Sequence, residues 1–469
     1  MNSRLWQHDV AGLTRAYKRG NLTPSTVMDA TLAQVAKYDP LFNAFCHLDS
    51  ARARKDAAAS TKRWLAGKPL GVLDGVPVTI KDWYDVKGWP TRQGSLVTSD
   101  AAQGQDSFVV SALKNVGAII IGKTTLPEFG HKGVTHSPLS GITRNPWDAT
   151  KTSGGSSGGA AVAAATGMGW LHLGSDAGGS IRMPASFCGV VGFKPSPGLM
   201  PSWPPSLFSS LSSMGPLARS VDDAALMTHV LAAAALYNSS DWHNVGRDAA
   251  ERALYEPSLG KRRLRIAVSD SINGHKLWPA AQKIWDKYKK HFKTLGTVKN
   301  IDLTIDGVTE VFTSHWTAAA SLIGANIPKE RHKLLDARFK HWIARGDRQH
   351  LHDYLRAQYR RMIIGGQMSA LFADYDLIIT PATVFTAFDA GIDMPLKKEG
   401  KGFEDWNVFS AFANLARLPA ISLPIGPADD GLPLGVQVCA PYLHDGLVLA
   451  AARKLESAFE FKDWLQRSQ

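Results

Sequence analysis

The 469-residue chain contains few cysteines and no long apolar segment. Its three cysteines, Cys46, Cys188 and Cys439, are far apart and form no Cys-x-x-Cys pair, which argues against a disulfide framework and a structural zinc site. No segment approaches the roughly 18 consecutive apolar residues of a transmembrane helix, and the N-terminal sequence lacks the apolar run of a signal peptide. We therefore expect a cytoplasmic protein that has no membrane partner, metal or other cofactor.

Several common catalytic motifs are also missing. The chain has no H-E-x-x-H zinc motif, no EF-hand loop and no G-x-S-x-G nucleophile elbow. Residues 117–124, GAIIIGKT, match the pattern of a phosphate-binding loop, but the four residues between the glycines are the strand-forming Ala-Ile-Ile-Ile. Because that loop must be an irregular turn that exposes backbone N–H groups, we interpret the match as a buried strand and not as a nucleotide site.

Basic residues outnumber acidic ones, and the formal net charge is +12 at pH 7. Lysine and arginine gather at residues 287–293 and 329–340. A positive surface can attract nucleic acid, but Trp285, Tyr288 and Phe292 recur at a helical spacing between the lysines. Since no known nucleic-acid-binding module accompanies the charge, we interpret these segments as solvated helix faces and expect no nucleic-acid partner.

Patterns typical of helices and strands alternate along most of the chain. Residues 1–66 are typical of helices, one of which has Thr23 and Pro24 in the N-cap and first-turn positions. Farther on, SFVVSALKNVG and residues 278–294 are typical of helices, and the strand-like segments are VPVTI, AIIIG, LRIAVSD, TVKNIDL, YDLIITP and AISLPIG. This alternation predicts an α/β protein with a mostly parallel or mixed sheet.

Two stretches rich in glycine and serine, SGGSSGG (153–159) and GGSIR (178–182), lie in the most apolar part of the chain. A small-residue run typical of a helix follows the first stretch at once, so we do not interpret the stretch as a domain linker. Backbone N–H groups beside Ser180 can form an oxyanion hole, and Lys81 can act as a base if burial lowers its pKa. Taken alone, each feature is better explained as a tight turn or a surface lysine.

Taken together, these segments resemble the amidase signature family. The match includes LGVLDGVPVTIKDWYDVKG, GGSSGGAAVAAATGMGWLHLGSDAGGSIRMPASFCGVVGFKPS and NLARLPAISLPIGPADDGLPLGVQVCAP, and it spans nearly the whole chain. The resemblance implies a single α/β/α domain with a large mixed sheet. It also implies hydrolysis of a carboxylic amide through an acyl-enzyme, and it leaves esters open as a second class of substrate.

The resemblance further implies a Ser–cis-Ser–Lys triad. The nucleophile falls on Ser180, the bridging serine on Ser156 after a cis peptide bond, and the base on Lys81. The other implied site residues are the oxyanion-hole donors Ala177, Gly178, Gly179 and Ser180, the supporting residues Gly155, Ser157, Asp176 and Arg182, and the pocket residues Trp83, His131, Phe385 and Trp406. Each of these pocket residues is equally consistent with the core. Ser153, Ser175 and Ala177 depart from the common pattern without touching the triad, so they leave the shape of the acyl pocket open.

Absence of an internal repeat or a low-complexity linker favours one domain over residues 1–469. We expect an N-terminal helical segment at 1–66, a catalytic core at 67–230, and further strands and pocket elements at 231–469. The expected partner is a small-molecule amide substrate, and a homodimer is left open.

Two alternative functions remain at this point. The first is the amidase subunit of a tRNA-dependent amidotransferase, which releases ammonia from glutamine, although residues 331–361 do not resemble the corresponding segment of those subunits. The second is a catalytically silent or nucleic-acid-binding relative. The presence of all three triad residues argues against that second alternative.

Overall fold

The computed structural model describes residues 5–202, 205–235, 243–256, 259, 263–395 and 404–467. Segments from most of the chain form one large sheet. Its strands are β1 (Phe45–Leu48), β2 (Pro77–Lys81), β3 (Ile119–Thr124), β6 (Leu171–Asp176), β7 (Val191–Lys194), β8 (Ser213–Ala218), β9 (Leu264–Val268), β12 (Gly296–Asn300), β13 (Leu377–Pro381), β14 (Ala420–Ile425) and β15 (Leu434–Cys439). Two small hairpins are β4 (His136–Ser137) with β5 (Gly141–Ile142) and β10 (Ser271–Ile272) with β11 (His275–Lys276).

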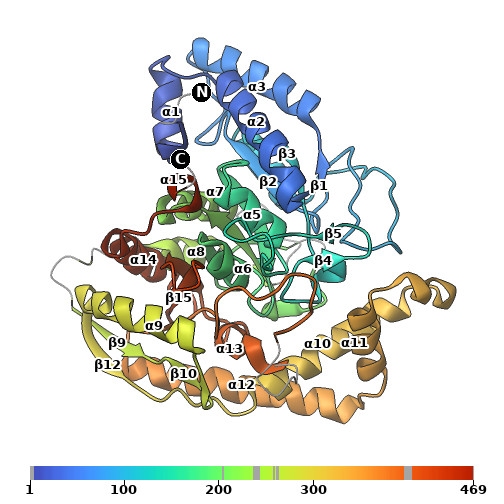
Figure 1. Ribbon diagram of the computed structural model, residues 1–469, viewed down its shortest axis with the longest axis vertical. Coiled ribbons are helices and arrows are strands. Elements are labelled where there is room, and N and C mark those ends of the chain that lie inside the picture. Colours follow the sequence, from blue (N-terminus) through green and yellow to red (C-terminus); the bar gives the residue numbers. More distant parts are fainter. Residues whose placement is uncertain are drawn as a thin grey trace.

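The 11 strands follow the order β1-β3-β2-β6-β8-β7-β14-β15-β13-β9-β12. β2 pairs in parallel with β3 and β6, and β9 pairs in parallel with β12 and β13, whereas the other neighbours are antiparallel. The sheet is therefore mixed, and helices lie on both of its faces (Figure 1). This arrangement confirms the predicted α/β class with a central mixed sheet.

The helices are α1 (Val10–Lys18), α2 (Pro24–Phe42), α3 (Ser50–Leu65), α4 (Phe108–Asn115), α5 (Gly158–Ala165), α6 (Arg182–Cys188), α7 (Val221–Ala235), α8 (Arg247–Leu254), α9 (Pro279–Tyr288), α10 (Val308–Ala325), α11 (Ala337–Asp347), α12 (Leu351–Asp374), α13 (Val408–Leu415), α14 (Asp445–Phe459) and α15 (Trp464–Arg467). Successive side chains of a strand point to opposite faces of the sheet, so neighbouring residues of one strand belong to different apolar cores. Ile120 of β3 belongs to the core under α7 and α14, whereas Ile119 and Ile121 belong to the core that contains α5 and α6.

The N-terminal segment is mostly helical, as predicted. Thr23 caps α2 in a capping box with Thr26, and Pro24 occupies the first turn. The prediction was wrong at Phe45–Leu48, which forms β1 and extends the edge of the sheet antiparallel to β3. Four residues are too few for the alternating pattern of a half-buried strand to be recognised in the sequence.

The segment that matches a phosphate-binding loop forms β3, as predicted. Lys123 of this strand is completely buried, and its Nζ forms an ion pair with Asp82 at 2.6 Å. It also donates to the carbonyl oxygen of Pro90 and the hydroxyl of Thr91. The lysine of the pattern therefore forms its ion pair and hydrogen bonds inside the fold.

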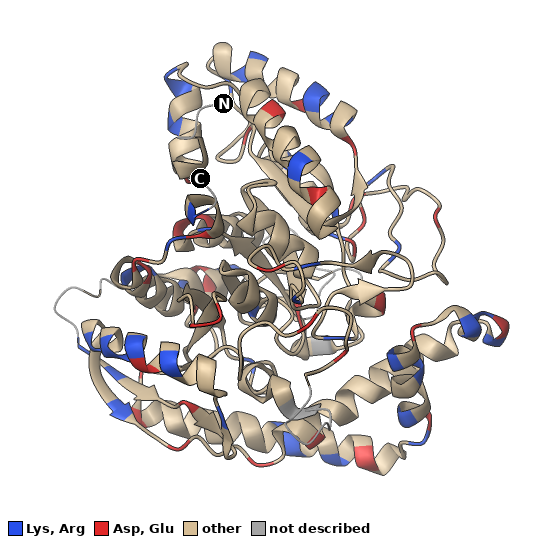
Figure 2. Cartoon of the chain, viewed as in Figure 1, with Lys and Arg blue, Asp and Glu red and all other residues tan. Residues whose placement is uncertain are grey.

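The basic segment 287–293 covers the end of α9 and a following 3-10 helix, Lys289–Thr294. Trp285 and Phe292 are buried with their ring centroids 5.2 Å apart. Figure 2 shows acidic and basic residues interspersed along the outer helices, with lysines along α9. This segment is a solvated helix face with an apolar underside, as predicted.

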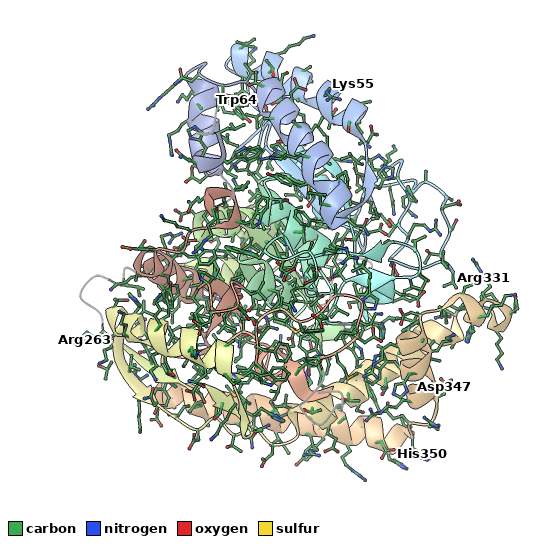
Figure 3. The ribbon with its side chains drawn as sticks, in the orientation of Figure 1. Lys55, Trp64, Arg263, Arg331, Asp347 and His350 are labelled. Carbon is green, nitrogen blue, oxygen red and sulfur yellow. The ribbon has the colours of Figure 1, made fainter. Side chains whose placement is uncertain are left out.

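α11 and α12 both pack on α10, and the three helices extend from the lower part of the molecule (Figure 1). Arg331, Asp347 and His350 lie along the outer edge of this helical unit (Figure 3). α10 also packs on α13, the helix that precedes the central strand β14 in the chain. Among the helices of the described ranges, none has the length and apolarity needed to cross a membrane.

Candidate active site

Lys81 is the last residue of β2, and its side chain is completely buried. Its Nζ lies 2.7 Å from Ser156 Oγ, 3.0 Å from Ser157 Oγ and 2.9 Å from Ser175 Oγ. Burial lowers the pKa of Lys81 to about 7, and the negative charge of Asp176 opposes this effect only in part. The neutral amine is therefore well populated near neutral pH.

A neutral Lys81 amine can satisfy all three of its hydroxyl partners. Ser157 Oγ donates to the carbonyl oxygen of Ser175 at 3.2 Å, so its single proton is used and it accepts from Lys81 Nζ. A neutral amine has two N–H donors and one lone pair. When Ser157 and Ser175 accept the two N–H groups, the lone pair faces the hydroxyl of Ser156, which can donate to it.

Ser156 lies in a backbone segment that is packed closely against its neighbours. The Gly155–Ser156 peptide bond is cis, as predicted. A Cβ atom on Gly155 would lie 2.6 Å from the carbonyl group of Val134, and one on Gly159 in α5 would lie 2.4 Å from the carbonyl oxygen of Ala44. Glycine is required at both positions because the neighbouring backbone occupies the space of a side chain.

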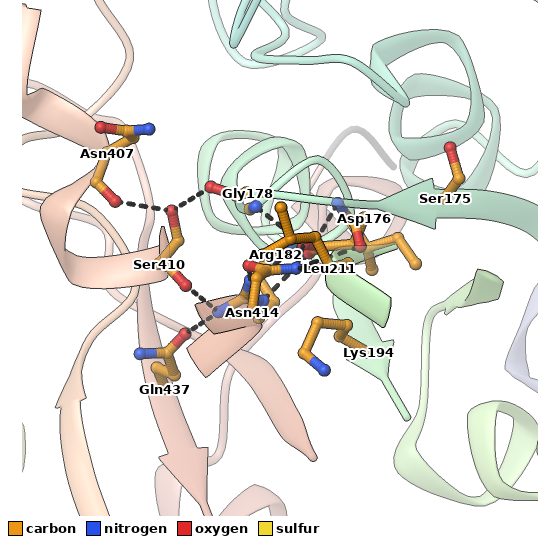
Figure 4. Close-up of polar contacts among 12 residues, drawn as sticks. Ser175, Asp176, Gly178, Arg182, Lys194, Leu211, Asn407, Ser410, Asn414 and Gln437 are labelled. Carbon is orange, nitrogen blue, oxygen red and sulfur yellow. Dashed lines mark hydrogen bonds and ion pairs between the residues drawn. The ribbon is translucent and has the colours of Figure 1, made fainter. Parts of the chain in front are cut away.

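Ser180 lies in the turn between β6 and α6, which a buried ion pair holds in place. Arg182 Nη2 and Nε lie 2.9 Å and 3.0 Å from the two carboxylate oxygens of Asp176, and both side chains are fully buried. Arg182 also donates to the side-chain oxygens of Gln437 and Asn414, both at 2.6 Å (Figure 4). Although burial raises the pKa of Asp176, the Arg182 guanidinium holds it well below its ordinary value.

The peptide between Gly178 and Gly179 faces this ion pair. Gly179 N–H donates to Asp176 Oδ1 at 2.7 Å, and Ser410 Oγ donates to the carbonyl oxygen of Gly178 at 2.7 Å (Figure 4). Gly179 N–H is therefore not free to bind a substrate oxygen, which differs from the sequence-based expectation. The sequence did not reveal that the carboxylate at the end of β6 would bind this amide.

The neighbouring amides of the same loop differ from Gly179. The N–H groups of Gly178 and Ser180 make no hydrogen bond with the residues that the structure describes. Ala177, which follows β6 directly, has its side chain in the apolar core that includes Phe312. The loop thus keeps the amides on either side of Gly179 available to a ligand at Ser180.

One predicted contact is not found. Ser157 N–H donates to the carbonyl oxygen of Ser180 at 3.1 Å, so the two serine-bearing segments are in direct contact. Within the described ranges, however, the Ser180 hydroxyl makes no hydrogen bond with Ser156 or any other residue. Hydrogen bonds between a nucleophile and its base often become short only when the substrate is bound.

Ser180 lines a cavity of about 320 Å³ whose walls include aromatic and charged side chains. Two of the predicted pocket residues, His131 and Trp406, line it as well. Sequence reasoning missed the walls contributed by α10 and α11, which are Phe312, Trp316 and Trp342. The four-residue spacing of Phe312 and Trp316 on one helix was the available signal, and their rings lie 5.1 Å apart.

The other two predicted pocket residues do not line this cavity. Phe385 is 3% exposed and packs behind Trp406, with ring centroids 5.8 Å apart. Trp83 lines a separate cavity with Tyr84 and Phe129. Both predictions were wrong because the direction of a side chain in a turn or loop is not set by a strand or helix period.

Charged side chains also line the cavity. Lys132 forms ion pairs with Asp336 at 2.8 Å and Asp393 at 2.9 Å. Arg338 and Arg345 lie over the ring of Trp342 at 4.5 Å and 5.9 Å. The interpretation of residues 329–340 as a solvated face was therefore wrong for Arg338, since α11 turns this residue toward the cavity. No group of histidine, cysteine and carboxylate side chains suited to a metal ion occurs within the described ranges.

Comparisons with known proteins find relatives that match nearly the whole chain. The family model described as Amidase matches residues 26–449. The chain is 33% identical over 485 residues to a glutamyl-tRNA(Gln) amidotransferase subunit of Prochlorococcus marinus (strain MIT 9313), covering 96% of this chain and 97% of that protein. It is 32% identical over 469 residues to an acylamidase of Rhodococcus erythropolis, covering 94% of each. The crystal structure of a bacterial aryl acylamidase superposes with a TM-score of 0.84, at 27% identity and 96% coverage of both chains.

Proposed function

Because this chain belongs to the amidase signature family, whose hydrolases act on amide bonds, we propose that it hydrolyses carboxylic amides through an acyl-enzyme on Ser180. In this proposal Ser156 relays the proton and Lys81 is the base. The observation that carries the proposal is the buried amine of Lys81, which lies 2.7 Å from Ser156 Oγ and has a pKa of about 7.

Attack on the amide requires that Ser180 lose its proton. The neutral Lys81 amine takes the proton of Ser156, and Ser156 takes that of Ser180 as the Ser180 oxygen bonds to the carbonyl carbon. The carbonyl oxygen becomes an oxyanion, which the N–H groups of Gly178 and Ser180 can bind. The fixed loop keeps these donors in place, because Asp176 and Arg182 hold its backbone.

Breakdown of the tetrahedral intermediate reverses the proton transfer. The C–N bond breaks, and the proton held by Lys81 passes through Ser156 to the leaving amine. The same pair then takes a proton from water, which attacks the ester carbonyl of the acyl-enzyme. Hydrolysis releases the carboxylic acid and restores the Ser180 hydroxyl.

The cavity favours amides with an apolar or aryl group. Its walls include Phe312, Trp316 and Trp406, and such rings bind flat apolar groups by burial and by offset or edge-on contacts. A volume of about 320 Å³ is at the small end of ligand pockets, so we propose a compact substrate such as an aryl or short aliphatic amide.

The proposal is tested by hydrolysis of a panel of aryl, aliphatic and amino-acid amides, with the matching esters included. We expect the purified chain to hydrolyse aryl amides, and we expect the Ser180→Ala variant to have lost turnover of every substrate. A native chain that hydrolyses none of the panel, or a Ser180→Ala variant with unchanged turnover, would overturn the proposal.

A second candidate function is favoured by the similarity to a component of an amidotransferase, which would act on glutamine. Free glutamine carries an ammonium group that needs a carboxylate partner. Of the described residues that line the cavity, Asp393 alone has a carboxylate, and Lys132 already pairs with it. Preferential hydrolysis of glutamine, and co-purification with further subunits, would favour this second function over the aryl amidase.

A further inference from the structure

One face of α12 carries large apolar side chains that are mostly exposed. They recur at intervals of three or four residues, are 53% to 70% exposed, and are Leu351, Leu355, Tyr359 and Met362. Leu355 lies two positions before the buried Ala357, which is about 200° around the helix. This apolar stripe is therefore opposite the face with which α12 packs on α10 and α13, at the outer edge of the molecule (Figure 1). Contiguous exposed apolar patches of this kind are uncommon on monomers and mark contact surfaces.

The stripe continues into the C-terminal half of α12 with small residues, which are Gly366, Ala370 and Ala373. Gly366 is exposed, and an added Cβ there would meet no atom within 4 Å, so the fold of the single chain does not require glycine. Glycine in the middle of a helix is destabilising relative to alanine. A second helix that packs closely on this face accounts for it, because small residues at a contact let two helix axes come nearer to each other.

Large and small residues of the stripe match when two copies of α12 lie antiparallel. If Met362 lies on a two-fold axis, Leu351 of one copy faces Ala373 of the other, since the two residues are equally far from the axis along the helix. Tyr359 of one copy then lies beside Gly366 of the other. Each large side chain meets a position with little or no side chain, so the ridges of one helix fill the grooves of the other. The same surface serves in both copies, and one two-fold axis closes the pair.

Charge favours the antiparallel arrangement over the parallel one. The basic residues of α12 all precede Met362, and the residues after it are uncharged up to Asp374. In a parallel pair the basic halves would face and repel each other, whereas in an antiparallel pair each faces the uncharged half. Arg348, directly before α12, then comes to the end of the helix that carries Asp374 of the other copy. Both of these side chains are exposed and form no ion pair within the described ranges.

We infer that this face of α12 is a homodimer interface, in which two copies of the helix pack antiparallel about a two-fold axis at Met362. No residue of α12 lines the cavity at Ser180, so each copy keeps a complete site. The inference does not depend on the proposed hydrolysis of amides.

Sedimentation velocity measures the dimer in the native chain and in two variants that each add one carboxylate to α12. Met362→Glu places two carboxylates at the axis, and because Met362 is 68% exposed the substitution does not disturb the fold. Gln367→Glu is the matched control, since Gln367 is exposed on the same helix outside the stripe. We expect the native chain to be a dimer at micromolar concentrations. Met362→Glu should raise its Kd by about 30-fold or more, and Gln367→Glu should leave the Kd within about three-fold.

A native chain that is monomeric at every concentration, or two variants with equal effects on the Kd, would overturn the inference. The main alternative occupant of the stripe is a lipid surface. A monomeric native chain that sediments with anionic phospholipid vesicles, together with a Met362→Glu variant that does not, would assign the stripe to lipid and reject the dimer.

Disulfide formation tests the antiparallel arrangement. Single cysteines are placed in a Cys46→Ser background, because Cys46 is the exposed one of the three native cysteines. Met362→Cys should form a disulfide between copies, since the axis brings its two Cα atoms within the about 4.4–6.8 Å that a disulfide spans. Leu351→Cys should not, because the two copies of this residue lie about 33 Å apart along the antiparallel helices. Equal linking of both variants, as a parallel pair would give, or linking of neither, would contradict the inference.

Discussion

Replacing Lys81 with methionine should stabilise the fold while it abolishes hydrolysis. Burial lowers the pKa of the lysine from 10.5 to about 7, and within the described ranges it forms no ion pair. Since each pKa unit corresponds to about 1.4 kcal/mol, burying the protonated amine costs the folded state about 5 kcal/mol. Methionine has a similar length and no charge, so the variant avoids this cost.

The loss of the Lys81 hydrogen bonds offsets part of this gain in stability. Lys81 Nζ contacts the hydroxyls of Ser156, Ser157 and Ser175, and each loses a partner in the variant. Ser157 keeps its hydrogen bonds with the backbone of Ser175, so the cost falls on the other two hydroxyls. At about 1.5 kcal/mol for each of these, the net stabilisation near pH 7 is about 2 kcal/mol.

The difference between the two chains should depend on pH in a direction set by the lowered pKa. Below pH 7 the lysine is protonated in both the folded and the unfolded chain, so the full cost is present. Between pH 7 and 10.5 the folded lysine has lost its proton while the unfolded one has not. Over this range the native chain gains stability relative to Lys81→Met by about 1.4 kcal/mol per pH unit.

Urea unfolding of both chains across the pH range from 7 to 10.5 measures this difference, because the other titrating groups are common to both. A difference in unfolding free energy that stays constant over this range would refute the lowered pKa. The hydrolysis rate of the native chain should rise with pH and reach half its plateau near pH 7, and Lys81→Met should show no such rise.

Two other predictions concern the supports of the site. Replacing Arg182 with methionine leaves the Asp176 carboxylate buried without its partner, so unfolding measurements should show a loss of about 3–5 kcal/mol. Adding Asp176→Asn should recover part of this loss, and a double variant no better than the single one would contradict the reasoning. Valine at Gly159 brings its Cβ to 2.4 Å from the Ala44 carbonyl oxygen and should cost about 1–3 kcal/mol. Alanine at Gly365 in α12, where an added Cβ meets no atom within 4 Å, should instead stabilise by about 0.5–1 kcal/mol, and equal thermal shifts of the two variants would rule out this packing account.

The elements that apolar patterning defines well were predictable from the sequence. Strands β2, β3, β9, β13 and β14 are rich in branched apolar residues, because most of their side chains are buried. The contact between Lys81 and Ser156 could not be predicted from such patterns. The two residues are 75 positions apart, and the family resemblance, not any local pattern, predicted that they meet.

The errors concern side-chain direction and contacts distant in sequence. Trp83 and Phe385 lie in loops after strands, where no period indicates which way a side chain points. Arg338 lies in a basic run that is typical of a solvated helix, yet α11 packs on α10 and carries it to the cavity. Neither the basic run of α11 nor the aromatic spacing of α10 indicates which element each helix will pack against.

The central claim is that Ser180 forms the acyl-enzyme, and intact-mass measurement after reaction with a fluorophosphonate probe tests it most directly. We predict one adduct on the native chain, located on Ser180 by peptide mapping, and none on Ser180→Ala. The Lys81→Met variant should label far more slowly, because the proton of Ser180 then has no base to accept it. An adduct that forms at the same rate on Ser180→Ala, or that maps to another serine of the native chain, would contradict the account.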